Sequence, residues 1–319
     1  MSTEPPGRGA TWTEEHGERA MKGEWGGGRG GADWTEERGS LRPSDEGRRH
    51  AKAPGGERAE TLSTAVHAEW TKLRTVSSTG WLLLTMIVVT VGFSILEVVV
   101  QKCPTSCSYD TPKLSLTGIL VGQAAAAVLA VLAVTGEYGS GMIRITLTAV
   151  PRRATALAAK AIVLTGVVLV TGTIAAAWSL IAGRYILPGN GFTGVRGSEV
   201  LSLSAGSTLR AAAGSVLYLA LIALFSLGLA TAIRDSGASI AVLLGLIYVV
   251  PLIVQFGILD PRWERHLEQW SPMNAGLAIQ ATRDLNTLPI GPWPGLGVLA
   301  LWAFGALLLG GLLLRLRDA

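Results

Sequence analysis

The chain contains 319 residues, of which 49% are hydrophobic and 16% are charged, against roughly 25% charged in an average soluble protein. The charge is also unevenly distributed, because 22 of the 50 charged residues fall within residues 1–60. The remaining 259 residues carry too few charges to cover the surface of a soluble globule of that size. This composition excludes an ordinary cytosolic enzyme.

Residues 1–60 differ sharply from the rest of the chain. They contain 13 glycines, charges of both signs and almost no aliphatic residues, so we predict a disordered, low-complexity cytoplasmic tail. One near repeat stands out, because residues 10–17 (ATWTEEHG) recur as residues 32–39 (ADWTEERG). Two interpretations remain open, a pair of short docking motifs with one Trp each or a duplicated stretch of low complexity.

Residues 62–77 have the pattern of an amphipathic helix. Leu62, Val66, Trp70 and Leu73 recur at steps of four, four and three, which places them on one helical face. Charged residues, Lys72 among them, occupy the other side. Such a helix can lie flat in the headgroup layer of a membrane or pack against a partner protein, and both remain open.

Six apolar runs follow. Five contain 20 to 24 residues without a charge, and the first contains only Glu97. A bilayer core of about 30 Å takes roughly 20 helical residues, so each run is long enough to cross. We therefore predict an all-α integral membrane protein whose six transmembrane helices cover approximately residues 81–100, 116–135, 158–183, 211–233, 236–259 and 295–314.

Several residues in and between the runs attract attention. Cys103 and Cys107 lie in the first external loop, where they could form a small disulfide or stay reduced. Gln123 could line a cavity or bridge two helices, as could Gln255. Pro251 should kink the fifth span.

The connection after the second span, residues 135–153, is amphipathic and basic. Tyr138, Met142 and Ile145 fall on one face, and Pro151 ends the predicted helix. Two interpretations are open for this short helix at the cytoplasmic surface: a basic anchor or a docking helix for a cytoplasmic partner.

Lys and Arg residues also set the predicted orientation. Six spans place both termini on one side, which collects 19 Lys and Arg residues against 8 in the opposite loops. The positive-inside rule therefore predicts cytoplasmic termini. Topology accounts for the net charge of +4, and a nucleic-acid partner is not expected.

Signatures of catalysis are missing from the sequence. It contains no G-x-x-x-x-G-K-[ST] phosphate loop, so we expect any ATP hydrolysis to occur in another chain. All four histidines lie outside the spans, which removes the base of a Ser–His hydrolase and the ligands of an intramembrane zinc protease. We expect no catalytic residues, no cofactor and no metal.

Three segments resemble the membrane-spanning permease subunits of type-2 ABC transporters. They are residues 68–75 (AEWTKLRT), the pattern Glu137-Tyr-x-x-Gly-x-x-Arg-x-Thr-Leu followed by Pro151-Arg-Arg and Lys160, and residues 270–279 (WSPMNAGLAI). With the six spans in register, the resemblance covers roughly residues 62–319. It implies a six-span permease domain over residues 61–319, with an N-terminal elbow helix at residues 62–77.

The resemblance also implies roles for individual residues. The segment 137–150 would be a coupling helix resting in a groove of an ATPase subunit. The residues expected to couple to the ATPase subunit are Glu137, Tyr138, Gly141, Met142, Arg144, Ile145 and Pro151. Those expected to anchor the chain at the membrane surface are Trp70, Lys72, Leu73, Arg74, Arg152, Arg153 and Lys160. Short external helices would form over residues 260–289.

Two functional hypotheses follow. In the first, the chain is the permease of an ABC exporter in a bacterial plasma membrane, working with two ATPase subunits, a second permease chain (identical or related) and membrane lipid. In the second, it is a stand-alone six-span sensor or scaffold that recruits partners through its tail. The coupling-helix pattern favours the first, whereas only the tail favours the second.

Overall fold

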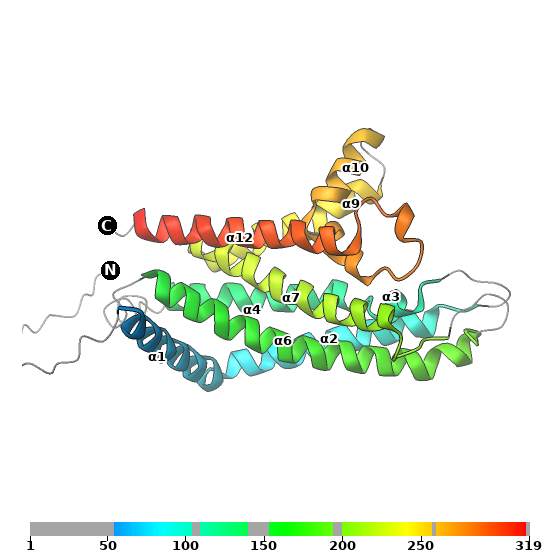
Figure 1. Ribbon diagram of the computed structural model, residues 1–319, viewed down its shortest axis with the longest axis horizontal. Coiled ribbons are helices and arrows are strands. Elements are labelled where there is room, and N and C mark those ends of the chain that lie inside the picture. The colour runs from blue at the N-terminus through cyan, green and yellow to red at the C-terminus, as the bar shows by residue number, and fades with distance from the viewer. Residues whose placement is uncertain (1–53, 104–108, 140–152, 194–199, 257–259, 317–319) are drawn as a thin grey trace, which may run out of the picture. The chain divides into compact units, whose positions relative to one another are not determined.

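The computed structural model describes residues 54–103, 109–139, 153–193, 200–256 and 260–316, which belong to one compact unit. Throughout these ranges the regular structure is helical, with no strand (Figure 1). Six helical stretches are long and apolar enough to cross a membrane, which confirms the predicted all-α fold. The predicted tail lies outside the described residues, apart from its last few residues, where the first helix begins, and so does most of the predicted coupling helix.

The spans follow an N-terminal helix, α1 (Pro54–Thr75). Five of them are single helices: α2 (Ser77–Val100), α4 (Ile119–Gly139), α6 (Arg153–Ile186), α7 (Gly206–Ile233) and α12 (Pro292–Leu316). The remaining span, the fifth, has three parts: α8 (Ser236–Leu244), a π-helical turn η4 (Gly245–Val249) and α9 (Val250–Gln255).

The π-helical turn lies where Pro251 would otherwise conflict with the helix backbone. Proline has no backbone N–H, and its ring clashes with the carbonyl four residues earlier, here that of Ile247. Ile247 lies inside the π-helical turn, whose wider backbone relieves this conflict. A π-helical turn thus directly precedes Pro251, and the predicted kink of the fifth span stays a prediction.

Helix α7 is the centre of the bundle. It packs against α4, α6 and α12, and it is the most completely buried of the six spans. Its contact with α12 is close, because a Cβ atom on Gly228 would lie 2.5 Å from the backbone nitrogen of Leu307. On α12, Gly310 faces the carbonyl oxygen of Gly228 in the same way. Small residues let transmembrane helices approach this closely.

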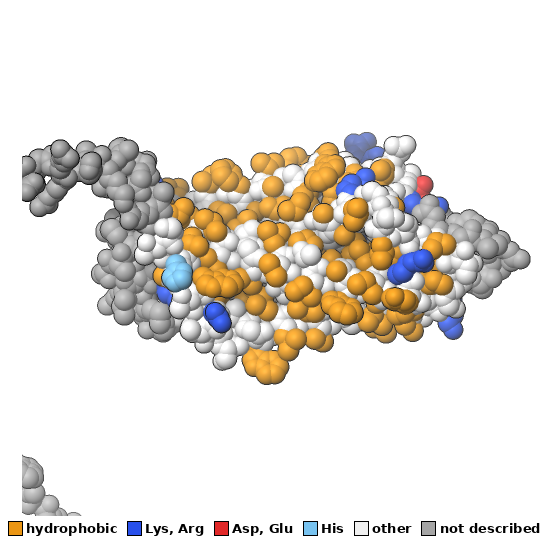
Figure 2. Space-filling model, turned by 60° about the horizontal axis from the view of Figure 1, so that its bottom comes forward, with side chains coloured by type: hydrophobic (Ala, Val, Ile, Leu, Met, Phe, Trp, Pro, Cys, Tyr) orange, Lys and Arg blue, Asp and Glu red, His pale blue; other side chains and the backbone are white. Residues whose placement is uncertain are grey.

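The surface of the spans is apolar. On α12 the exposed large side chains include Leu301, Phe304, Leu308 and Leu312, spaced three or four residues apart. On the face drawn in Figure 2, hydrophobic side chains run along the length of the bundle, and the Lys and Arg side chains of the described residues lie towards its two ends. Because such a surface needs a lipid environment, the chain is a multi-pass membrane protein.

One end of the bundle is covered by short elements. They are α3 (Thr111–Ser115), η2 (Leu187–Asn190), α10 (Pro261–Trp270), α11 (Pro272–Leu277), η5 (Ala278–Gln280) and η6 (Leu285–Thr287). Asp110 joins two of these regions, because its carboxylate caps α3 and accepts hydrogen bonds from the backbone N–H groups of Thr282 and Arg283 at 2.5 and 3.1 Å. The short helices expected over residues 260–289 are present.

Candidate functional site

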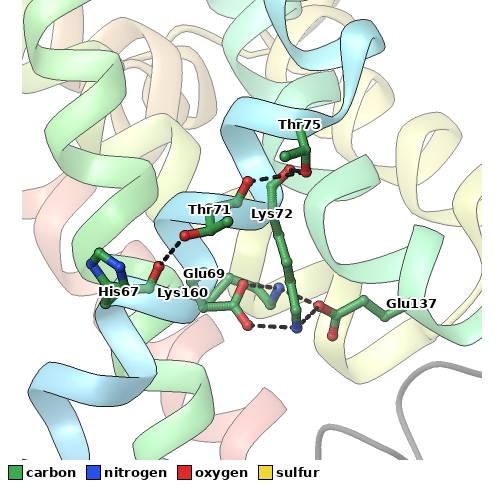
Figure 3. Close-up of polar contacts among 7 residues, drawn as sticks. All are labelled: His67, Glu69, Thr71, Lys72, Thr75, Glu137 and Lys160. Carbon is green, nitrogen blue, oxygen red and sulfur yellow. Dashed lines mark hydrogen bonds and ion pairs between the residues drawn. The ribbon is translucent and has the colours of Figure 1, made fainter.

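Four charged side chains meet at the opposite end of the bundle, beside α1 (Figure 3). Glu69 and Lys72 come from α1, Glu137 from the end of α4 and Lys160 from the first turns of α6; we call these four residues the ion cluster. The Lys160 ammonium lies 2.7 Å from Glu69 Oε2 and 2.9 Å from Glu137 Oε1. The Lys72 ammonium lies 3.0 Å from an oxygen of each carboxylate. Each lysine therefore binds both glutamates.

The ion cluster is largely shielded from solvent. The exposed fraction of the side chain is 6% for Glu69, 12% for Glu137 and 11% for Lys160, and it rises to 34% only for Lys72. Buried charges are stable only when they are paired, and here each of the four charged groups lies within 3.0 Å of two groups of opposite charge. The cluster thus joins α1 to α4 and α6 through charge-assisted hydrogen bonds.

The helical period explains why α1 turns this face inward. Glu69 and Lys72 are three residues apart and lie on one side of the helix, together with the buried Ala65. That side packs on α6, whereas Trp70 stays 48% exposed on another side. The amphipathic helix predicted for residues 62–77 is present and ends at Thr75, and the side that carries Ala65, Glu69 and Lys72 packs against the bundle.

The carboxylates also change the titration of Lys72. Burial lowers the pKa of Lys72, but the hydrogen bonds and negative charges of Glu137 and Glu69 outweigh burial and raise it above the ordinary 10.5. A raised lysine pKa means that the pairing stabilises the fold fully below the pKa of the unfolded chain and is lost as pH rises through the folded value.

We therefore expect a specific pH dependence for the Lys72→Met variant in detergent. The difference in melting temperature between wild type and Lys72→Met should stay constant from about pH 6 to about pH 9 and should shrink only above about pH 10.5. Thermal unfolding followed by circular dichroism at each pH measures it. A difference that disappears between about pH 7 and about pH 9 would contradict the assignment of a raised pKa.

The structure describes only some of the other predicted site residues. Tyr138 follows Glu137, and the Arg234 guanidinium lies 5.5 Å from the centre of its ring. Leu73 is half-buried and Arg74 is exposed. Arg153 is the first residue of α6, and its side chain is not described. The predicted site residues that lie outside the described residues are Gly141, Met142, Arg144, Ile145, Pro151 and Arg152.

Cys103 is buried, whereas Cys107 lies outside the described residues. Cys103 is disulfide-bonded, so of the two states considered for it the structure shows the bonded one.

Sequence reasoning assigned no role to Glu69. From the sequence, Glu69 is one charged residue on the polar side of an amphipathic helix, and we would expect such a residue to be solvated. Its partner Lys160 is 91 residues away in the chain, so no local pattern connects the two. The sequence offered only a weaker indication of the cluster. Glu69 and Lys72 form a pair at i, i+3 ahead of the first span, and Glu137 and Lys160 are isolated charges at the ends of the second and third spans.

A cavity of about 430 Å³ lies next to the ion cluster. All four cluster residues line it, together with apolar side chains of α2, α4 and α6. Its lining therefore combines charged groups from the bundle end with apolar groups from the spans.

A second polar network lies inside the bundle. Tyr218 of α7 donates a hydrogen bond to the Gln123 side-chain oxygen of α4, and Gln123 Nε2 donates to the Leu120 carbonyl at 2.9 Å. Tyr248 of the fifth span donates to the same carbonyl at 2.7 Å. Of the two roles considered for Gln123, the structure shows the bridge between helices. The side chain of Gln255 is not described.

Among the described residues, no group of three or more His, Cys, Asp or Glu side chains is placed to hold a metal ion. No model of a known protein family matches this chain, and no curated protein matches it either.

Proposed function

We propose that this membrane protein is the permease subunit of an ABC exporter in a bacterial plasma membrane. Two ATPase subunits would bind on the side of the termini, and a second permease chain would complete the translocation path. The proposal rests on the sequence patterns at residues 68–75, 137–160 and 270–279, joined to a six-span helical fold with a helix ahead of the first span.

The observation that carries the proposal furthest is the position of the ion cluster. Glu137 is near the end of α4 and Lys160 near the start of α6, so the two residues bracket the segment 140–152 in the chain. That segment contains most of the expected coupling helix. An exporter needs a rigid link between an ATPase subunit and its spans. The cluster supports such a link, because it ties both flanking helices to each other and to α1.

The proposal also assigns the energy source. ATP binding and hydrolysis would occur in the partner chains, and their closure would push on the segment 140–152. The push would reach α4 and α6 together, because separating Glu137 from Lys160 would break a charge-assisted hydrogen bond between largely buried groups. Both spans pack on the central helix α7, which would carry the movement across the bundle.

Purification from native membranes in mild detergent tests the proposal. We expect a chain with a phosphate-loop ATPase motif to co-elute in near-stoichiometric amount, identified by mass spectrometry. The variant Arg144→Glu should lower the retained ATPase about tenfold or more, because it reverses a charge expected at the contact. The matched control is Arg262→Glu on α10, an exposed charge reversal at the other end of the bundle.

Two results would contradict the proposal. One is a single chain that elutes alone and stays stable in several detergents, which would favour the sensor or scaffold. The other is an ATPase partner that both variants retain equally, which would show that the contact does not use the segment 140–152.

A further inference from the structure

The cavity beside the ion cluster has two chemically different ends. Its inner part is apolar and is formed by α2, α4 and α6, through Leu82, Leu129, Leu132, Ala133 and Leu164. Its outer part is polar and is formed by the ion cluster and the junction between α1 and α2. At about 430 Å³ it falls within the roughly 300–1,000 Å³ typical of ligand pockets. A matching ligand must therefore be amphipathic.

The polar end favours a negatively charged group. Lys72 is the most exposed member of the cluster, and the two carboxylates are more deeply buried. The first turn of α2 also lines the cavity through Ser78 and Thr79, and the N-cap residue Val76 makes no side-chain capping hydrogen bond. The start of an uncapped helix carries partial positive charge and N–H groups that can donate to an anion.

We propose that this cavity binds one membrane phospholipid. An acyl chain occupies the apolar part between α2 and α4, and the phosphate lies against the Lys72 ammonium and the start of α2. The location fits, because the polar end lies at the ends of α4 and α6, where a span meets the headgroup layer. The size also fits a small molecule, whereas a partner protein needs a contact area of at least about 1,000 Å².

A bound phospholipid would hold α1 independently of the ion cluster. The lipid would contact α1 through Lys72 and Leu73 and contact the spans through its acyl chain. Docking of α1 would then depend on the lipid supplied. This inference holds whether or not the chain works with an ATPase.

Gly136 offers a way to fill the cavity without disturbing the fold. It lines the cavity, and a Cβ atom added to it would meet nothing within 4 Å. The variant Gly136→Leu should therefore place a side chain in the space of the acyl chain. A second filling variant is Ala133→Leu, one turn earlier on the same helix. The matched control is Gly166→Leu on α6, where an added Cβ also meets nothing within 4 Å.

Native mass spectrometry of the full-length protein tests the proposal with dioleoylphosphatidylglycerol as the probe. Wild type and Gly166→Leu should retain one lipid at an activation energy that removes the loosely bound ones. Both filling variants should lose it while melting at the temperature of wild type. Wild type without a retained lipid would overturn the proposal, and so would a folded Gly136→Leu variant that retains it.

The headgroup contact has its own test. Replacing the probe by dioleoylglycerol, which lacks the phosphate, should weaken binding to wild type about tenfold, as expected for losing a hydrogen bond to a charged group. The variant Lys72→Gln should show a smaller preference for the phosphate-bearing lipid than wild type, because only the start of α2 would still contact the phosphate. If wild type binds both lipids equally, the phosphate does not lie at Lys72 and the proposed binding mode is wrong.

Discussion

Replacing Lys160 by Met is expected to lower the free energy of unfolding by about 3 kcal/mol. The change removes a positive charge whose side chain is 11% exposed and which binds both carboxylates. Within the cluster, Glu69 and Glu137 would then keep Lys72, which is its most exposed member. The change takes one positive charge out of this buried site, and removing one partner of a buried ion pair typically costs about 3–5 kcal/mol. Met keeps the aliphatic length, so little packing is lost.

Unfolding in a denaturing detergent, followed by circular dichroism, measures this loss. The control is Lys113→Met, an exposed lysine of α3 at the other end of the bundle, which should change stability by no more than about 0.5 kcal/mol. The double variant Glu137→Gln with Lys160→Met should be more stable than Lys160→Met alone, because it leaves one neutral pair of Glu69 and Lys72. Equal losses in the Lys160 and Lys113 variants would show that the cluster does not stabilise the fold.

The second large effect is expected at the contact between α7 and α12. Gly228→Ala should lower the free energy of unfolding by about 3 kcal/mol, because the added Cβ atom would lie 2.5 Å from the backbone nitrogen of Leu307. The contact is with the backbone, which no side-chain rotation can move away. The helices must separate, and the close packing through Gly310 is then lost as well.

The matched control for this variant is Gly305→Ala, in the middle of α12. An added Cβ atom there meets nothing within 4 Å, and Ala has the higher helix propensity, so stability should stay equal or rise slightly. The same detergent titration compares the two variants. If Gly228→Ala is as stable as Gly305→Ala, the close approach of α7 and α12 is not needed for the fold.

The helix boundaries show how far the apolar pattern reaches. The third span was predicted at residues 158–183, and α6 runs from Arg153 to Ile186. The helix begins earlier than the apolar run because backbone hydrogen bonds do not require apolar side chains, whereas the prediction counted only residues suited to the bilayer core. The fifth span was predicted as one stretch, and the sequence indicated a disturbance at Pro251 without showing that it would be a π-helical turn.

The candidate site was much less accessible from the sequence. Lys72 and Lys160 were predicted as anchors for lipid headgroups, and Glu137 as a contact for an ATPase subunit. The structure places their charged groups against one another, with Lys72 and Glu137 separated by 65 residues in the chain. A charge pattern along one helix shows which residues share a face. It does not show what that face contacts, because the contact depends on how the neighbouring helices pack.

Run length and composition alone predict six helices long and apolar enough to cross a membrane, and the described residues contain six, because the thickness of the bilayer sets the length of an apolar helix. Periodicity alone also establishes that the residues before the first span form an amphipathic helix. Only the packing of α1 against α6, with the ion pair from Lys72 to Glu137 of α4, decides that Glu69 and Lys72 face the bundle. The physical reason is pairing: Glu69 and Lys72 can leave water only where Glu137 and Lys160 supply opposite charges, and those partners are brought to α1 by the fold.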